Sequence, residues 1–528
     1  MLFTSYSFIA FLTIMIAVYW LAPKKWQWGL LLLGSYVFYA FSGLENLIFI
    51  FVTTLSSFVV SHLMERCRKK EELYLANNKE TLDKEARKTY KAKEKKKRFH
   101  ILLCGLVLNF GILAVIKYTA FAVSNLNSFI SLFNGKALDI PSLLLPMGIS
   151  FYIFQSMGYL IDVYRGRAEA QNNIFKFALF VSFFPQLVQG PISRFSDLGE
   201  QLITPHTFSC KEFVFGAQRV LWGFFKKLVI ADRILPVMNG LLDSPEEYTG
   251  FYVVILILLY SVEIYADFTG GIDITIGIAQ MLGIKLTENF KHPFSSRSTK
   301  EYWNRWHITM GSWFTDYVFY PLSVCRPMMK LSKFSRKTLG NKIGKRVPVY
   351  LATVVTWFLT GLWHGAGWNF IVWGLLNCLV ILVSQELEPL YARFRNRFPK
   401  LVATNAYGNF MAVRTFIIMG VIRSLDCYRD VGLTFKMWGS IFTDMNLVEA
   451  VSNAKEIGLT AAELAIIGVG VLIVFAVSKI SAKGSVRERL YSKPVLSWIL
   501  CGSLFVAVIL FGAYSIGYDG AQFIYNQF

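Results

Sequence analysis

The chain has 528 residues, of which 54% are hydrophobic and only 17% charged. Windows of about 20 mostly apolar residues, the length of a membrane-spanning helix, recur along it with no long polar region between them. This composition excludes an ordinary soluble enzyme, and in a membrane protein a net charge of +20 marks cytoplasmic loops rather than a nucleic acid partner. We predict an all-α polytopic membrane protein, one transmembrane unit over residues 1–528 in contact with membrane lipid.

The first apolar stretch, Leu2–Ala22, follows no Lys or Arg and precedes Pro23-Lys24-Lys25. It lacks the basic start and the cleavage site of a signal peptide, so we expect it to be retained. Within residues 66–99, the stretch Arg66–Arg98 holds 14 Lys or Arg against 6 Asp or Glu, which predicts a basic cytoplasmic loop. Counting back from this loop places the N-terminus outside the cytoplasm.

Further along, the run Ile174–Ile192 is broken by Pro185, Gly190 and Pro191, which favours a re-entrant segment over a full crossing. Residues 285–347 are predicted to lie at the cytoplasmic face, since Arg326–Arg346 contains 8 Lys or Arg and no acid. Residues 409–528 add C-terminal spans, and we count about a dozen crossings in all. Apolar helices are expected at His100–Ala122, Leu143–Tyr164, Phe213–Ile230, Tyr252–Phe268, 347–364, 368–384, Phe410–Ile422, Leu464–Val477 and Leu496–Tyr514.

The chain offers no recognisable metal or cofactor site. Its 7 cysteines form no CxxC pair, and its histidines show neither HExxH nor HxxxH spacing. No glycine-rich nucleotide fingerprint follows a predicted strand. We therefore expect no bound metal or cofactor.

Two of the 6 histidines stand out. His307 and His364 are embedded among tryptophans and small residues, where a neutral imidazole can serve as a general base near neutral pH. The alternative is a core histidine that donates to a backbone carbonyl. We interpret the other four histidines as interfacial, solvated or turn residues: His62, His100, His206 and His292.

Glycines and acids flank these histidines. Gly361, Gly365 and Gly367 bracket His364, and glycine in a membrane helix allows close packing or opens the backbone beside a cavity, so His364 should face protein. Asp267 and Asp273 lie near a glycine pair where we expect a span to end. They either orient a histidine or an arginine or cap helices.

Many segments, in order, resemble the membrane-bound O-acyltransferases, specifically the bacterial branch with the alginate O-acetylation membrane subunit and the D-alanyl transfer protein of teichoic acids. The chain length and the spans after about residue 409 are closer to the alginate type, whereas Gly270-Gly271-Ile272-Asp273 departs from the family pattern. The segments are Met1-Leu-Phe-Thr-Ser, Leu145-Pro-Met-Gly-Ile-Ser-Phe-Tyr152, Tyr159-Leu-Ile-Asp-Val-Tyr-Arg-Gly166, Phe184-Pro-Gln-Leu-Val-Gln-Gly-Pro191, Asp267-Phe-Thr-Gly270, Glu288-Asn-Phe290, Trp303-Asn-Arg-Trp-His307 and Gly361-Leu-Trp-His-Gly365.

The resemblance implies a helical bundle with re-entrant segments, and a cytoplasmic and an extracytoplasmic funnel that meet near the invariant histidine, here His364. His307 occupies the family's second position. It also implies an acyl-thioester donor, acetyl-coenzyme A or an acyl carrier protein, that enters from the cytoplasm. The basic surface of residues 285–347 suits the phosphates of coenzyme A or an acidic carrier.

We expect His364 to act as general base and His307 to position the thioester carbonyl or stabilise the oxyanion. We expect a protein of the bacterial cytoplasmic membrane that O-acetylates an extracytoplasmic or cell-wall polysaccharide, with an extracytoplasmic partner protein that accepts or relays the acyl group. D-alanyl transfer to teichoic acid is one alternative, and a flippase of lipid-linked sugar, which predicts repeated halves, is another. The substrate-channel candidates are Trp303, Asn304, Arg305, Asp267 and Trp363.

Overall fold

The computed structural model describes residues 3–514 of the protein, and all regular structure in this range is helical. The chain divides into two compact units. Unit 1 comprises the described residues up to Val214 together with Ile278–Leu286, and unit 2 comprises Phe215–Gly277 and the described residues from Thr287 onward. Residues 1–2 and 515–528 of the predicted single unit lie outside the described range, and that single unit stays a prediction.

Seven helices in the described range are long and apolar enough to cross a membrane. This confirms a multi-pass helical membrane protein. The count is below the dozen crossings that we expected, and two further apolar helical stretches, Tyr6–Leu21 and Ile174–Gln189, are shorter than the seven. The seven are Leu44–Asn77, Lys84–Ser131, Phe251–Met281, Val347–His364, Trp368–Glu386, Ala461–Ser481 and Pro494–Phe511.

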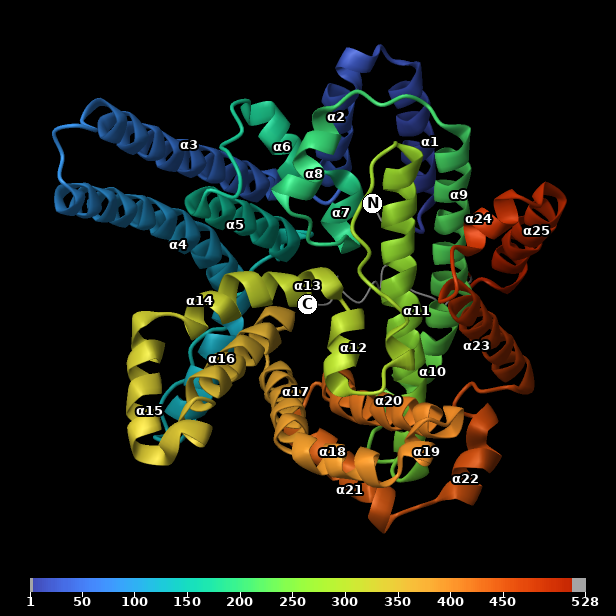
Figure 1. The fold of residues 1–528 in the computed structure, drawn as a ribbon. Helices are drawn as coiled ribbons and strands as arrows, with labels where there is room; N and C mark the ends of the chain where they lie inside the picture. Colours follow the sequence, from blue (N-terminus) through green and yellow to red (C-terminus); the bar gives the residue numbers. More distant parts are fainter. Residues whose placement is uncertain (1–2, 515–528) are drawn as a thin grey trace. The chain divides into compact units, whose positions relative to one another are not determined.

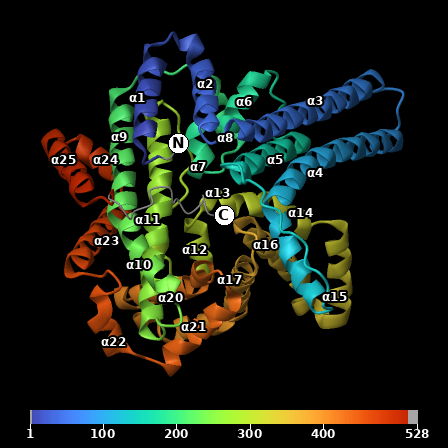
Figure 2. The same cartoon turned by 180° about the vertical axis from the view of Figure 1, so that it is seen from behind.

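Unit 1 is built around a long helical hairpin. Helices α3 and α4 run side by side, and α5 packs against both (Figures 1 and 2). The helices of this unit are α1 (Tyr6–Leu21), α2 (Gln27–Ala40), α3 (Leu47–Asn77), α4 (Lys84–Ser131), α5 (Ile149–Arg165), α6 (Ile174–Ser182), α7 (Phe184–Gln189) and α8 (Phe195–Ile203), and α9 (Cys210–Phe224) begins in it.

The basic segment 66–99 is helical for most of its length, and its cytoplasmic location stays a prediction. Helix α3 continues to Asn77 and α4 starts at Lys84, which leaves only a short turn between them. Lys and Glu are good helix formers, and pairs such as Arg68–Glu65 at 2.8 Å and Arg98–Glu71 at 3.1 Å stabilise the two helices. The charge pattern had indicated the segment's polarity but not its helicity.

The run predicted to be re-entrant is broken as expected. Helix α6 ends at Ser182, and α7, which has Pro185 in its first turn, has only 6 residues. The backbone N–H of Phe184, at the break, donates to Ser35 Oγ at 3.1 Å, so α2 provides a partner for the interrupted backbone. Neither helix is long enough to cross a bilayer by itself.

Unit 2 contains the remaining helices, with two π-helical segments among them. Helix α9 passes into the π-helix Phe225–Ala231 in the middle of the run Phe213–Ile230 that we had expected to be one span. The helices are α10 (Asp232–Asp243), α11 (Phe251–Met281), α12 (Thr299–Arg305), α13 (Ile308–Phe314), α14 (Tyr320–Ser323), α15 (Arg326–Gly344), α16 (Val347–His364), α17 (Trp368–Glu386), α18 (Glu388–Arg397), α19 (Pro399–Val402), α20 (Asn405–Tyr428), α21 (Val431–Thr443), α22 (Leu447–Ser452), α23 (Ala461–Ser481), α24 (Val486–Tyr491) and α25 (Pro494–Phe511).

Helix α11 is longer than predicted. We expected this span to end near Phe268, with Asp267 and Asp273 at its end, but the helix continues through Gly270 and Gly271 to Met281. Gly270 lies close to its neighbours, since a Cβ there would lie 3.0 Å from the carbonyl oxygen of Gly223 in α9 and 3.3 Å from the backbone nitrogen of Lys227 in the π-helix. Gly270 therefore serves helix packing.

Helices α16 and α17 form a tight hairpin. A Cβ at Gly361 would lie 2.3 Å from the carbonyl oxygen of Phe370, and one at Gly374 would lie 2.4 Å from that of Trp357. Helix α17 also packs on α20, where Trp373, Ile422 and Leu425 form a buried core cluster. This packing fixes the end of α16, which is where His364 lies.

Candidate active site

His307 occupies a strained position between two short helices. Helix α12 ends at Arg305 and α13 begins at Ile308, and His307 between them has φ 48° and ψ 52°, in the left-handed region. A residue other than glycine adopts this conformation only where its surroundings enforce it, at a cost of about 1–3 kcal/mol. The side chain is 0% exposed. Such strain is typical of a functional residue.

Asn289 provides the contacts that enforce this conformation. Its Oδ1 accepts hydrogen bonds from the backbone N–H of Thr309 at 3.1 Å and from Thr309 Oγ1 at 2.9 Å, and it lies 3.3 Å from His307 Nδ1. Its backbone carbonyl accepts from the N–H of Ile308 at 3.0 Å. Sequence reasoning noted Asn289 only within the Glu288-Asn-Phe290 segment and gave it no role.

The protonation of His307 follows from its burial. Burial, with the positive charge of Arg423 in addition, lowers the pKa of His307 to about 3. The ring of Phe268 meets the imidazole edge-on, with centroids 4.9 Å apart, and contributes to the apolar surroundings. His307 is therefore neutral over the whole physiological pH range.

His364 is the last residue of α16, and the chain turns there at Gly365, whose N–H donates to the carbonyl of Gly361 at 3.3 Å. A Cβ at Gly365 would lie 2.0 Å from the ring of Phe370, so the turn has no room for a larger residue. The imidazole packs edge-on against Trp373, with ring centroids 4.6 Å apart. The half-buried imidazole therefore contacts protein on this side, and its role stays a prediction.

Trp363 connects the two histidines. Its ring centroid lies 5.8 Å from that of His307 and 5.0 Å from that of His364, and its side chain is buried. Two imidazoles that are 57 residues apart in sequence, at positions 307 and 364, thus contact the same tryptophan ring. Their catalytic roles stay a prediction.

Trp303 belongs to the same cluster. Its Nε1 donates to Asn377 Oδ1 at 3.1 Å, and its ring lies 5.5 Å from Trp373 and 5.1 Å from Trp357. Trp303 and Trp363 therefore form part of the wall around the histidines. The structure gives them no polar contact with a substrate group, so their role as channel residues stays a prediction.

Asn304 and Arg305 lie outside this cluster. The side chain of Asn304 is exposed, and Arg305 pairs with Glu301 of its own helix at 2.6 Å. In the described part of the chain, no hydrogen bond or ring contact joins either of them to His307 or His364. Their place in the substrate channel stays a prediction.

Asp267 is wholly buried and forms an ion pair with Lys227 at 2.6 Å. Lys227 also pairs with Asp232 at 2.6 Å. Asp267 directly precedes Phe268 in the sequence, and the ring of Phe268 contacts His307. The ion pair is therefore next in sequence to a residue that contacts the histidine. Sequence reasoning identified the acid but gave no role to Lys227, which lies inside the run Phe213–Ile230 that was expected to be one span.

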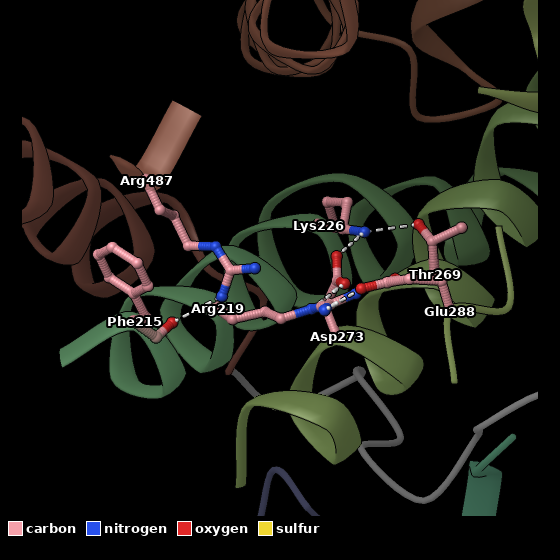
Figure 3. A network of polar contacts seen from close by, with 7 residues as sticks. All are labelled: Phe215, Arg219, Lys226, Thr269, Asp273, Glu288 and Arg487. Carbon is pink, nitrogen blue, oxygen red and sulfur yellow. Dashed lines mark hydrogen bonds and ion pairs between the residues drawn. The ribbon is translucent and has the colours of Figure 1, made fainter. Parts of the chain in front are cut away.

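A second charged network lies along α9 and α11. Arg219 donates to both oxygens of Glu288 at 2.6 Å and to Asp273 Oδ1 at 2.8 Å, while Lys226 donates to Asp273 Oδ2 at 2.6 Å and to Thr269 Oγ1 at 2.7 Å (Figure 3). Of the alternatives we left open for Asp273, orientation of an arginine is the one observed. Glu288 is adjacent to Asn289, so this network fixes the segment that contacts His307.

Comparison with known proteins agrees with this site. The pattern of MBOAT, the membrane-bound O-acyltransferase family, matches residues 168–426, which include both histidines. The chain is 34% identical over 390 residues to "Probable alginate O-acetylase AlgI" of Azotobacter vinelandii, covering 74% of this chain and 69% of the relative.

The names of two other relatives refer to different polymers. "Peptidoglycan O-acetyltransferase" of Helicobacter pylori is 30% identical over 341 residues, 59% of this chain and 60% of that protein. "Teichoic acid D-alanyltransferase" of Streptococcus thermophilus is 28% identical over 249 residues, 46% of this chain and 57% of that protein. The chain therefore belongs to the membrane-bound O-acyltransferase family and is a multi-pass O-acyltransferase.

Proposed function

We propose that the protein transfers an acetyl group from a cytosolic thioester donor to a hydroxyl of an extracytoplasmic polysaccharide. The observation that carries this proposal is the pair of imidazoles, His307 and His364, on one buried aromatic cluster inside the segment that matches the family. The acetyl group is favoured because the acetyl-transferring relatives match more of the chain than the D-alanyl-transferring one does.

The proposed donor is acetyl-coenzyme A, with an acetylated carrier protein as the alternative. Helix α15 supports a phosphate-bearing donor, because its Lys and Arg side chains lie on a segment that carries no acid from Arg326 to Arg346. Both donors carry phosphate and a thioester. A thioester is already activated, so transfer to a hydroxyl requires positioning and acid–base catalysis by the protein.

His364 is the proposed general base. It removes the proton of the acceptor hydroxyl while the oxygen attacks the thioester carbonyl carbon, and a tetrahedral oxyanion forms. The carbon–sulfur bond then breaks, the acyl group remains on the oxygen as an ester, and the imidazolium of His364 returns the proton to the departing thiolate. General base catalysis of this kind contributes about 10²- to 10⁴-fold.

The acceptor is proposed to be a polysaccharide, reached through an extracytoplasmic partner protein. The described chain consists of helices and short connections, and no large domain that could bind a polymer is apparent among residues 3–514. A partner that accepts the acyl group, or presents the polymer, would supply that surface.

The protein reconstituted in sealed liposomes tests the proposal. Radiolabelled acetyl-coenzyme A is added on one side, an alginate oligosaccharide is enclosed on the other, and label in the oligosaccharide and in free acetate is followed. Wild type is expected to consume the thioester, and His364→Ala and His307→Ala are expected to lose that activity. Turnover of a D-alanyl carrier but not of acetyl-coenzyme A would replace the proposed acyl group. Absence of thioester turnover together with transbilayer movement of lipid-linked sugar would favour the flippase.

A further inference from the structure

We propose that Asn289 is the positioning residue of His307: it holds the imidazole with its proton on Nδ1, so that Nε2 presents a lone pair to the substrate. This inference deepens the proposed function and rests on it, since it defines what His307 can do there. It makes His307 a hydrogen-bond acceptor toward a protonated substrate atom, and it excludes the oxyanion-stabilising role that we considered from the sequence.

The orientation of the Asn289 amide follows from its neighbours. The backbone N–H of Thr309 can only donate, and it lies 3.1 Å from the atom assigned as Oδ1. The amide nitrogen in that place would bring two donors together, so the oxygen must face Thr309. The same oxygen lies 3.3 Å from His307 Nδ1.

The tautomer of His307 follows in turn. An amide oxygen only accepts, so Nδ1 of His307 must carry the proton, and in a neutral imidazole the other nitrogen is then an acceptor. Nε2 could donate to an oxyanion only if the ring held two protons. The low pKa of His307, caused by burial and by Arg423 of α20, opposes that state.

The segment that carries Asn289 is held at several points, so the amide is a rigid reference for the ring. The N–H of Lys291 donates to the carbonyl of Arg305 at 2.9 Å, and the N–H of Ile308 donates to the carbonyl of Asn289 at 3.0 Å. Glu288 receives two hydrogen bonds from Arg219 at 2.6 Å each (Figure 3). Asn289 is itself 0% exposed.

These contacts also account for the backbone of His307. Bonds from Ile308 and Thr309 to Asn289 fix the residues directly after His307, and together they enforce its left-handed φ of 48°. The same asparagine therefore sets both the backbone and the tautomer. A residue that acts only in packing would not determine the position of a proton.

The experiment combines a spectroscopic and a kinetic measurement on the full protein in liposomes. Solid-state NMR of ¹⁵N-histidine-labelled protein reports which ring nitrogen is protonated, and His307→Gln identifies the signal of His307. Turnover of acetyl-coenzyme A is measured from pH 5 to 9 on wild type, Asn289→Ala and Asn289→Asp. Asn109→Ala is the matched control, since Asn109 is equally buried but bonds Ser56 and the carbonyl of Gly105 in unit 1.

The expected wild-type signal is a proton on Nδ1 of His307 throughout this pH range. Asn289→Ala is expected to lose that tautomer and to lower kcat about 10- to 100-fold, with a smaller change in KM. Asn289→Asp keeps an acceptor oxygen, so it should restore the tautomer and part of kcat. The negative charge of the aspartate raises the pKa of His307, so the imidazole becomes protonated at a higher pH than in wild type. The loss of activity on acidification should therefore begin at a higher pH in this variant.

A wild-type proton on Nε2, or an unchanged tautomer and pH profile in Asn289→Ala, would overturn the inference. Asn109→Ala is expected to lower stability without altering either readout. If wild type shows the Nδ1 tautomer and its dependence on Asn289 but turns over no thioester, the positioning role holds and the proposed function is what fails.

Discussion

The imidazole of His364 meets the indole of Trp373 edge-on, with ring centroids 4.6 Å apart. Trp373 in turn is anchored in the core cluster with Ile422 and Leu425 of α20. The proposed base at the end of α16 is thus held by a side chain of α17 that itself packs against α20. Rigid support of this kind is what keeps a catalytic group in reacting geometry.

Replacement of Trp373 by alanine should disable the enzyme by releasing His364. A displacement of about 1 Å can cost about 100-fold in rate, and we expect a loss of kcat of about that size. Loss of the buried indole should also lower stability by about 3–5 kcal/mol. Turnover per folded protein, with folding measured by thermal unfolding in detergent, separates the two effects. Trp438→Phe is the control, because Trp438 packs on the same cluster and bonds Ser424 rather than a histidine. Equal turnover by Trp373→Ala and wild type would contradict the supporting role.

Gly361→Ala should separate α16 from α17. The new Cβ would lie 2.3 Å from the carbonyl oxygen of Phe370, a backbone atom that cannot move without shifting the helix. We expect a lower unfolding temperature and strongly reduced activity. Gly468→Ala, on α23, provides the comparison, since nothing lies within 4 Å of its Cβ position and alanine there favours the helix. Similar unfolding temperatures for the two variants would show that the α16–α17 contact is not tight.

Arg219→Met should destabilise unit 2, because it removes the cation that pairs with Glu288 and leaves Asp273 with Lys226 alone. Removing one partner of a buried ion pair costs about 3–5 kcal/mol, and the partial exposure of Glu288 places the effect at the lower end. Addition of Asp273→Asn should deepen the loss, because buried Lys226 would then lack its carboxylate partner. Lys436→Ala serves as the surface control, since its pair with Glu246 is highly exposed and should matter little. Equal unfolding temperatures for Arg219→Met and Lys436→Ala would contradict a structural role for the network in Figure 3.

The low pKa of His307 makes stability dependent on pH. The folded protein does not protonate this ring until about pH 3, whereas the unfolded chain does so near pH 6.5, so falling pH favours the unfolded state between these values. At pH 5 the loss should be about 2 kcal/mol relative to pH 8. Unfolding temperatures of wild type and His307→Gln at both pH values test this, with a shallower dependence expected for the variant. Parallel pH profiles would mean that His307 titrates normally.

Both histidines could be singled out from the sequence because an imidazole among tryptophans is costly unless it has a use. Their common neighbour Trp363 was also identified, but the polar partners were not. Asn289 precedes His307 by 18 residues, and Lys227 precedes Asp267 by 40. Contacts across such separations depend on how the helices cross, and no local pattern encodes them.

Element boundaries differed for identifiable reasons. The segment 66–99 was read as a loop because its charge excludes it from the bilayer, yet Lys and Glu also favour helix, and the helices continue through it. The glycine pair after Phe268 was read as the end of a span, but the helix continues, and Gly270 allows α11 to approach α9 closely. A charged segment can be a loop or a helix outside the bilayer, and a glycine can end a helix or allow another helix to pack closely. The tertiary packing decides which of these occurs.

The central claim is that His364 catalyses acyl transfer from a thioester. The most direct measurement is the rate of coenzyme A release from acetyl-coenzyme A by purified wild type and by His364→Ala, with equal folding verified by thermal unfolding. The proposed mechanism predicts that the variant loses at least about 100-fold in rate. Equal rates in the two proteins would contradict the assignment of His364 as the base.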